Sequence, residues 1–292
     1  MNQIKTFLAA TNAISPRRLI VSTGIAAAVL IVPALMAWIA GWCWAPDGGA
    51  WITAAVIVTD SAGFPCVIAT SGVLAVLFLF LIKPARLREI IAFIVLGTAA
   101  VGCAQGIKSL LKNIVREPRP YVVWLGQTRA LDSDVFYKMP RDTRAAWIEK
   151  NLASEPRVPA VLREHWKSET GFSFPSGHTA FVAVWTMLGA ALLWARGRGG
   201  RVVCCAVALW AVAVEFTRLA LGMHWPADVA ISALLGWVTV VVLVAIWKKF
   251  ATRGADDGAD NATRDPASNP AGDPANNPTN DPAGDSASDA AT

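Results

Sequence analysis

The stretch that decides the fold runs from residue 174 to residue 223. It reads FPSGHTAFVAVWTMLGAALLWA at 174–195, RGRGGR at 196–201 and VVCCAVALWAVAVEFTRLALGM at 202–223. Each long run is close to the roughly 20 apolar residues that a helix needs to cross a bilayer. Because only arginines and glycines separate the two runs, the stretch predicts two membrane helices joined by a tight hairpin.

Four further apolar runs of similar length lie at 19–42, 64–82, 90–111 and 229–247. Together with the hairpin they predict the fold class, an all-α integral membrane protein with six transmembrane helices. The first run follows two arginines and is too long for a cleaved signal peptide, so we expect it to be retained. Residues 50–59 are too short to span and are expected to lie at the membrane interface.

The composition excludes a soluble enzyme. Of 292 residues, 54% are apolar and 16% are charged, whereas soluble domains carry about 25% charged residues. The mean hydropathy is +0.45. The five cysteines show neither a metal-binding nor a disulfide spacing. A Cys43–Cys66 bridge is conceivable, but we favour small buried apolar residues.

Basic residues predict the topology. They lie in or next to the short segments 5–18, 83–88, 196–201 and 248–249, whereas 43–63 and 224–228 contain no Lys or Arg. The positive-inside rule then places both termini in the cytoplasm. The long connection, about 113–173, is predicted to be a folded helical cap between the third and fourth spans, on the outer face. Since topology accounts for the basic residues, no nucleic-acid partner is expected.

Composition also predicts two parts, a membrane domain at 1–252 and a tail at 253–292. From residue 265 the tail repeats every four residues as DPAS, NPAG, DPAN, NPTN and onward. Proline removes backbone donors, and alanine alone cannot build an apolar core. We therefore expect a disordered cytoplasmic tail without a catalytic role.

The first cluster of chemically active residues is KNIVREPRP at 112–120. Lys112 supplies a mobile positive charge, and Arg119 supplies a fork that can grip two phosphate oxygens. Alone the cluster is weak evidence for a phosphate site, since basic residues at helix ends often snorkel to the interface. We expect Lys108 to do so. Tyr121 could contact the phosphate or headgroup, although interfacial anchoring is the usual role of tyrosine.

The second cluster is PSGH at 175–178, at the start of the fourth span. Gly177 lets the backbone approach a ligand closely. The N–H groups of Ser176, Gly177 and His178 would face outward with the positive end of the helix dipole, which favours an anion. His178 can protonate a leaving oxygen near neutral pH.

The third cluster runs from Thr217-Arg218 to His224 and Asp228. Arg218 lies at membrane depth, where an unpaired charge costs about 3 kcal/mol, so it needs an anionic partner. We favour Glu215, one helical turn earlier. Asp228 falls in the first turn of the sixth span and should reach back as a capping residue. It would thereby hold one nitrogen of His224 and leave the other free to attack.

Taken together, the clusters indicate phosphoryl chemistry, in which catalysis is mainly positioning and neutralisation of oxygen charge. One histidine would attack and the other would protonate the leaving group. No acidic cluster suggests a metal site, so we expect no metal and no cofactor, with basic side chains in that role. The third histidine, His165, is more readily explained by packing against Trp166 than by catalysis.

These motifs resemble the signature of the type-2 phosphatidic acid phosphatase superfamily, K-x6-RP, PSGH and SR-x5-H-x3-D. The order and spacing agree, and Thr217 replaces the usual serine while keeping its hydroxyl. The resemblance runs from about 90 to 247. Within the superfamily, RPYVVWLG and VLREHWKSETGFSFPSGHTAF look like the loop of bacterial phosphatidylglycerophosphatases.

The resemblance implies a six-span enzyme of the bacterial inner membrane with its site at the periplasmic face. It implies a phosphohistidine on His224, oriented by Asp228, with His178 as general acid. The phosphate-binding residues would be Lys112, Arg119, Ser176, Gly177 and Arg218. The implied substrate is phosphatidylglycerophosphate, together with phosphatidate, lysophosphatidate and undecaprenyl pyrophosphate.

Two alternatives share every site residue. One is a main role on undecaprenyl pyrophosphate, and the other is a phosphotransferase that moves the phosphoryl group to another lipid or sugar. A non-catalytic transporter or scaffold ranks last, because it would tolerate replacement of His178, His224 or Arg218, and all three are present.

Overall fold

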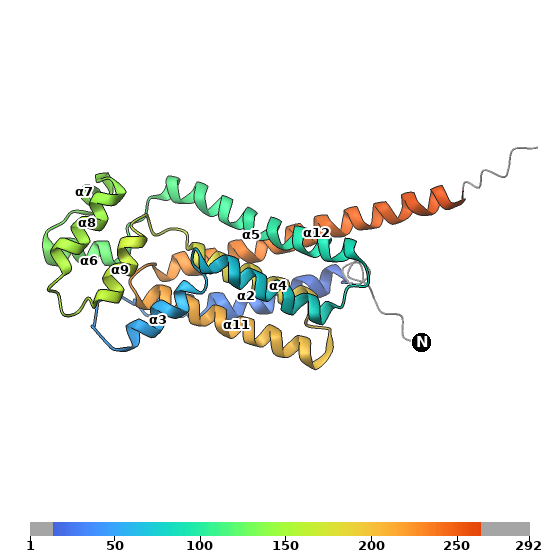
Figure 1. Ribbon diagram of the computed structural model, residues 1–292, viewed down its shortest axis with the longest axis horizontal. Helices are drawn as coiled ribbons and strands as arrows, with labels where there is room; N and C mark the ends of the chain where they lie inside the picture. The colour runs from blue at the N-terminus through green and yellow to red at the C-terminus, as the bar shows by residue number, and fades with distance from the viewer. Residues whose placement is uncertain (1–13, 264–292) are drawn as a thin grey trace, which may run out of the picture. The chain divides into compact units, whose positions relative to one another are not determined.

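A computed structural model describes residues 14–263, and every regular element in that range is a helix (Figure 1). The helices are α2 (Pro16–Ile39), α3 (Trp51–Asp60), α4 (Cys66–Ile82), α5 (Leu87–Val115), α6 (Pro120–Arg129), α7 (Ser133–Lys138), α8 (Arg141–Leu152), α9 (Ala160–Ser168), α10 (Gly177–Leu192), α11 (Gly197–Ala220) and α12 (Pro226–Thr263). Each of the six predicted apolar runs overlaps one long helix, and residues 50–59 lie almost wholly in α3. The predicted all-helical class is confirmed.

Four helices in the described range are long and apolar enough to cross a membrane, namely α2, α5, α11 and the part of α12 from Pro226 to Lys249. The apolar helices α4 and α10 are shorter, with 17 and 16 residues. At 1.5 Å per residue they reach roughly 25 Å, somewhat less than the hydrocarbon thickness of a bilayer. Both begin directly after turns that contain a proline, at Pro65 and Pro175.

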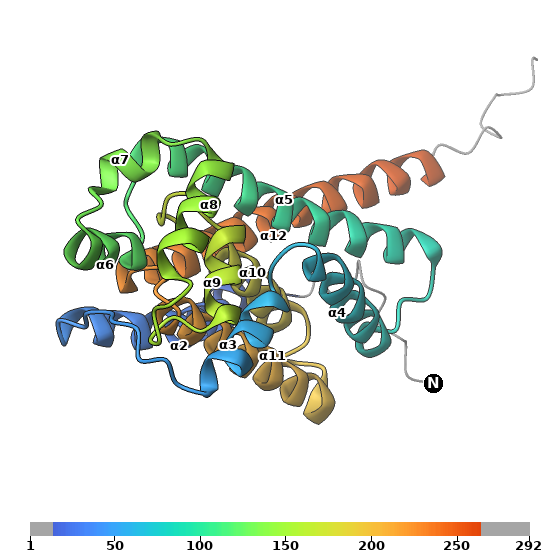
Figure 2. The same ribbon diagram turned by 60° about the vertical axis from the view of Figure 1, so that its left-hand side comes forward.

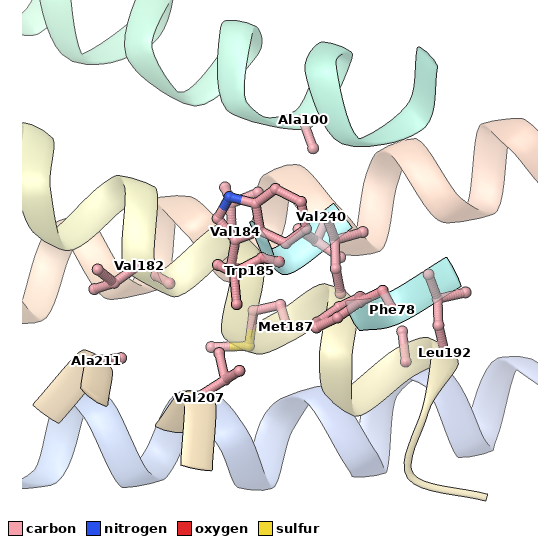
Figure 3. Packing of buried hydrophobic residues seen from close by; sticks show 14 of the residues in the cluster. Phe78, Ala100, Val182, Val184, Trp185, Met187, Leu192, Val207, Ala211 and Val240 are labelled. Atoms are coloured by element: carbon pink, nitrogen blue, oxygen red, sulfur yellow. The ribbon is translucent and has the colours of Figure 1, made fainter. Parts of the chain in front are cut away.

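Helix α10 lies at the centre of the bundle and packs against α2, α4, α5 and α11. All of its residues from Thr179 to Leu192 are buried, as expected for a helix that is apolar on every side. Figure 3 shows part of this core, where Trp185 meets Phe78 edge to face at a centroid distance of 5.4 Å. The core therefore fixes the start of α10, which carries His178.

Helices α6 to α9 gather at one end of the bundle in both views (Figures 1 and 2). They share an apolar core with α3 and with the turn after α11, and this core includes Phe136, Ile148 and Leu162. Tyr121 stacks on Trp166 in this core, with ring centroids 4.6 Å apart and planes 11° apart. Its side chain is fully buried in this packing, so the contact with phosphate or headgroup and the interfacial anchoring both stay predictions.

The chain separates into two units, residues 1–252 and residues 253–292, and the site lies in the first. Helix α12 continues through residues 253–263, which the sequence analysis assigns to the tail, and residues 264–292 lie outside the described residues. All five cysteines are free, so Cys43 and Cys66 form no bridge. Only Cys204 is buried, and the expectation of burial is wrong for the other four, which are exposed.

Candidate active site

The three sequence motifs meet at one cavity of about 320 Å³. The predicted residues that line it are Lys112, Arg119, Gly177, His178 and His224. Gln105, Lys108 and Glu169 add polar groups, and Val67 and Val101 are among the apolar ones. The structure therefore brings both proposed reacting histidines to the same space.

A short turn between α11 and α12 carries His224. The backbone N–H groups of Met223 and His224 both donate to the carbonyl of Arg218, at 3.1 and 3.2 Å. Gly222 has a φ of +69°, and a Cβ there would lie 2.6 Å from the Trp44 ring. The turn thus requires glycine for its backbone conformation and for the space that Trp44 occupies.

Asp228 caps the start of α12, as the sequence predicts. Its Oδ2 accepts the backbone N–H of Trp225 at 2.9 Å and also the hydroxyl hydrogen of Ser173. The same oxygen lies 3.4 Å from Nδ1 of His224, and that nitrogen has no hydrogen-bond partner in the described residues. Catalytic hydrogen bonds are often long in ligand-free proteins, so the orienting role of Asp228 stays a prediction.

His224 is set up as a neutral imidazole. Its side chain is almost fully buried. Burial and the nearby charges of Arg119 and Arg218 hold the pKa of His224 well below its ordinary value. The ring therefore keeps a lone pair at neutral pH, which is the form that can attack phosphorus.

The start of α10 differs in part from the prediction. The hydroxyl of Ser176 accepts the backbone N–H of Thr179 at 3.3 Å, which makes Ser176 the helix N-cap. Its own N–H donates to Oγ of Ser232 at 2.7 Å. Ser176 is thus buried, and both its N–H and its hydroxyl have partners in the protein, so its role as a phosphate ligand stays a prediction. The N–H groups of Gly177 and His178, at the first two helical positions, have no partner within the helix.

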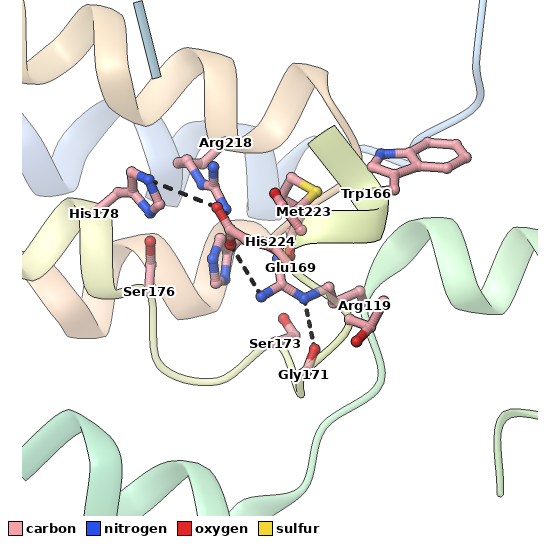
Figure 4. Close-up of polar contacts among 12 residues, drawn as sticks. Arg119, Trp166, Glu169, Gly171, Ser173, Ser176, His178, Arg218, Met223 and His224 are labelled. Carbon is pink, nitrogen blue, oxygen red and sulfur yellow. Dashed lines mark hydrogen bonds and ion pairs between the residues drawn. The ribbon is translucent and has the colours of Figure 1, made fainter. Parts of the chain in front are cut away.

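Glu169 lies at the centre of the cationic groups (Figure 4). Its Oε2 is 2.7 Å from Arg218 and 3.2 Å from Arg119. Its Oε1 is 3.6 Å from Nε2 of His178. The sequence prediction that Arg218 has an anionic partner is confirmed, but the partner is Glu169 in the loop before α10.

The prediction that Glu215 pairs with Arg218 is wrong. Glu215 is 4% exposed, and its Oε1 has no hydrogen-bond partner in the described residues. It lines a different cavity, between α2, α11 and α12. Spacing along one helix favoured Glu215, whereas the folded loop delivers Glu169 to two guanidinium groups at once.

The charge of Glu169 is stabilised by its neighbours. Burial alone would raise the pKa of this carboxyl, but Arg218, His178 and Arg119 outweigh that effect and hold the pKa well below its ordinary value. Glu169 is therefore ionised at neutral pH, and an incoming phosphate would compete with it for the same two arginines.

Arg218 has two further side-chain partners besides Glu169. Its NH1 donates to Oγ1 of Thr59 at 2.9 Å and lies 3.2 Å from Nε2 of His165. Since a guanidinium can only donate, that nitrogen must accept, and the proton of His165 belongs on Nδ1. Nδ1 in turn lies 3.4 Å from Oδ1 of Asp60. His165 is thus a buried support for Arg218 rather than only a packing partner of Trp166.

The remaining cations come from α5 and from the start of α6. Arg119 donates to the carbonyls of Gly171 at 2.6 Å and Met223 at 3.3 Å. Lys112 lines the cavity as predicted, and Lys108 lines it too, although the sequence analysis expects it to snorkel. In the described part of the chain, no group of three His, Cys, Asp or Glu side chains is placed to hold a metal.

Sequence reasoning missed three contributors to the site. Glu169 and Ser173 lie just before PSGH, and the signal was an acid and a hydroxyl in a loop between basic motifs. Gly63 lies against His178, because a Cβ there would be 2.7 Å from Nε2 of that ring. No local pattern marks Gly63, since it comes from the turn between α3 and α4.

The profile of the PAP2 superfamily, the type-2 phosphatidic acid phosphatases, matches residues 90–251. The chain belongs to the PAP2 superfamily. Phosphatidylglycerophosphatase B of Escherichia coli strain K12 is 39% identical over 226 residues, a match that covers 77% of this chain and 87% of the relative. Phosphatidylglycerophosphatase B of Haemophilus influenzae is 35% identical over 199 residues, covering 67% of this chain and 81% of the relative.

The family membership and the apolar helices make this PAP2 protein a phosphatase of bacterial type that resides in a membrane. The superfamily profile spans all three sequence motifs and the loop that carries Glu169. The profile does not reach α2, α3 or α4, although Thr59 and Gly63 from that region contact the site.

Proposed function

We propose that this PAP2 protein hydrolyses the terminal phosphomonoester of phosphatidylglycerophosphate to phosphatidylglycerol. The observation that carries the proposal is the pair of histidines on one cavity that Lys112 and Arg119 also line, with Arg218 bound to Glu169 of the same cavity. The relatives named phosphatidylglycerophosphatase B support the substrate. Phosphatidate, lysophosphatidate and undecaprenyl pyrophosphate carry the same terminal phosphate and are expected to be weaker substrates.

In the first step, the neutral ring of His224 attacks phosphorus and forms a phosphohistidine, and the bond to the lipid oxygen breaks. His178, in its protonated form, donates its proton to that oxygen. Oε1 of Glu169 lies 3.6 Å from Nε2 of His178 and can orient that ring toward the leaving oxygen. Asp228 stabilises the positive charge that develops on His224.

In the second step, water attacks the phosphohistidine. The neutral His178 accepts a proton from this water, so phosphate is released and both histidines return to their starting forms. The arginines and Lys112 neutralise the charge on the phosphoryl oxygens throughout. No step of this scheme uses a metal or a cofactor.

The proposal places six spans, α2, α4, α5, α10, α11 and α12, in the bacterial inner membrane with both termini in the cytoplasm. The site and the helices at about 113–173 then lie at the periplasmic face. A lipid phosphate at headgroup depth would reach the cavity while its chains stay in the bilayer. Residues 253–292 would form a cytoplasmic tail outside the catalytic unit.

The test is phosphate release from phosphatidylglycerophosphate by the purified full chain in detergent, with and without EDTA. We expect EDTA to leave the activity intact and His224→Ala to reduce it by about 10⁴-fold or more. With substrate labelled at the terminal phosphate, rapid quenching should trap an acid-labile, base-stable label on the protein. His224→Ala should abolish that label.

Lys150→Ala, in α8 and away from the cavity, serves as the matched control and should keep full activity. Loss of activity with EDTA, or a labelled His224→Ala protein, would contradict the mechanism. Transfer of the labelled phosphate to a lipid or sugar instead of water would assign a phosphotransferase.

A further inference from the structure

Glu215 is a buried acid that the proposed reaction does not use. It lies on α11 three residues before Arg218, but Arg218 is paired with Glu169. Glu215 is 4% exposed, and its Oε1 has no hydrogen-bond partner in the described residues. An acid buried without a partner among apolar side chains is costly, so its surroundings indicate which ligand it would bind.

Its carboxyl faces a cavity of about 300 Å³ that is separate from the active-site cavity. The walls come from α2, α11 and the start of α12, and they include Pro33, Ala37, Phe216 and Val229. All of the walls except Glu215 are apolar. Small-molecule sites have this character: they are cavities of at least about 300 Å³ with apolar walls and one or a few polar groups that fix the orientation of the ligand.

The position along α11 sets the depth of this cavity. Glu215 is five residues before the last residue of the helix, Ala220, or roughly 7 Å along its axis. The catalytic turn follows directly after Ala220. Trp42, which also lines the cavity, is a residue type that favours the membrane interface. The carboxyl therefore lies close to the level of lipid headgroups rather than at mid-membrane.

The charge of the cavity determines which kind of lipid headgroup it would bind. In the described residues the lining contains no basic side chain, so the chain itself supplies no cation to Glu215. The active-site cavity nearby is strongly cationic, whereas this one carries a single acid. Phosphate heads are therefore disfavoured here, and a positively charged head is favoured. Phe216, 65% exposed, extends the apolar wall outward, where an alkyl chain would continue.

We propose that this PAP2 protein has a second amphiphile site, in which Glu215 binds the ammonium head of a membrane lipid whose chain lies between α2 and α11. The ammonium donates to the carboxylate and neutralises it. The site is distinct from the phosphate-binding cavity and does not depend on the proposed reaction.

The test uses decylammonium that carries a photoreactive diazirine on its alkyl chain, added to the full chain in neutral detergent. After irradiation, labelled peptides are identified by mass spectrometry. We expect labelling of residues 33–42 and 212–220 that saturates with probe. Unlabelled decylammonium should displace the probe, and decanol of the same length should not.

Three variants sharpen the result. Glu215→Gln keeps the shape and removes the charge, so labelling should fall at least about tenfold. Ala37→Phe fills the cavity and leaves the charge, so it should also abolish labelling. Glu164→Gln removes an exposed acid elsewhere and should label like the wild type.

Equal labelling of Glu215→Gln and wild type would overturn the proposal, and so would competition by decanol as strong as that by decylammonium. In another outcome, the wild type stays unlabelled and copurifies with another membrane protein that Glu215→Gln no longer binds. That result would assign the cavity to a protein partner and overturn the proposal of a bound lipid. Labelling requires no turnover, so none of these outcomes bears on phosphate release.

Discussion

Two cavities near the end of α11 are each lined by one acidic side chain, but the surroundings of the two acids differ: one is among charged groups and the other among apolar ones. In the active-site cavity, Glu169 is surrounded by Arg119, Arg218 and His178. In the cavity between α2 and α11, Glu215 faces only apolar walls. The acid of the first cavity is therefore part of a charge network, whereas the acid of the second lacks a counter-ion within the described chain.

The comparison teaches that position on one helix is a weak guide to ion pairing. Glu215 and Arg218 are one turn apart, a spacing that often gives a pair on a helix surface. In this fold Arg218 is fully buried and points into the active site, where the loop before α10 supplies Glu169. A loop acid can satisfy two guanidinium groups at once, and a neighbour on the same helix cannot.

The largest expected contrast is in catalysis. Arg218→Ala removes a guanidinium that would stabilise phosphoryl charge, so kcat/KM should fall by about 10³-fold. Glu215→Gln should change kcat/KM by less than about twofold, because Glu215 lies outside the active-site cavity. Assays of both variants on the same lipid phosphate provide the measurement, and a comparable loss in the two would erase the distinction between the cavities.

The next contrast is in stability. Glu169→Gln leaves Arg119 and Arg218 buried without their shared anion, which should destabilise the fold by about 3 kcal/mol. Glu215→Gln removes an uncompensated acid and should be neutral or slightly stabilising. Unfolding in detergent, followed by circular dichroism, gives both values. A Glu215→Gln protein as unstable as Glu169→Gln would mean that Glu215 has a partner in the protein.

The carboxyl of Glu169 should also make the stability of the fold depend on pH. The pKa of Glu169 is well below its ordinary value in the folded protein, so its contribution to stability is complete above about pH 4.3, the usual unfolded value. The contribution is lost as the pH falls through the lower folded pKa. Unfolding measured from pH 7 to pH 3 should show this loss in wild type and a smaller loss in Glu169→Gln. Parallel curves for the two proteins would contradict the assignment.

The smallest effect is expected at His165. His165→Ala removes the acceptor for Arg218 and should raise KM roughly tenfold, with less change in kcat. His165→Gln offers a side-chain oxygen in a similar place and should recover most of the loss. If the alanine variant loses kcat and KM stays constant, His165 takes part in the chemistry directly rather than through Arg218.

Much of the fold could be predicted because the long apolar runs are unambiguous at this hydropathy. Each run overlaps a helix, and Asp228 caps α12 as its place in the first turn predicts. Helices α4 and α10 are shorter than their runs, since the turns around Pro65 and Pro175 take the first residues of each run and α10 also ends at Leu192, before the end of its run. The burial of Tyr121 was unpredictable, because only the fold of α6 to α9 brings Trp166 beneath its ring.

The candidate site was predictable where chemistry is encoded locally. His178 and His224 lie in short motifs, and both line the expected cavity. The supports around them come from distant segments, such as Ser232 at Ser176 and Asp60 at His165. The bond from the Ser176 N–H to Ser232 could not be predicted, because a serine at a helix start can serve a ligand or the helix itself and Ser232 lies 56 residues away.

The turn that holds His224 bears on how short a fragment of this chain could still be catalytically active. The family match begins at residue 90, yet the indole of Trp44 covers Gly222 and donates to the carbonyl of Ala220 at 2.7 Å. Thr59 and Gly63 brace Arg218 and the ring of His178 from the same early segment. A fragment trimmed to residues 90–251, the part that the profile matches, would keep every signature residue while losing the early segments that position them. Adding back residues 40–65 as a separate peptide is the natural complementation experiment.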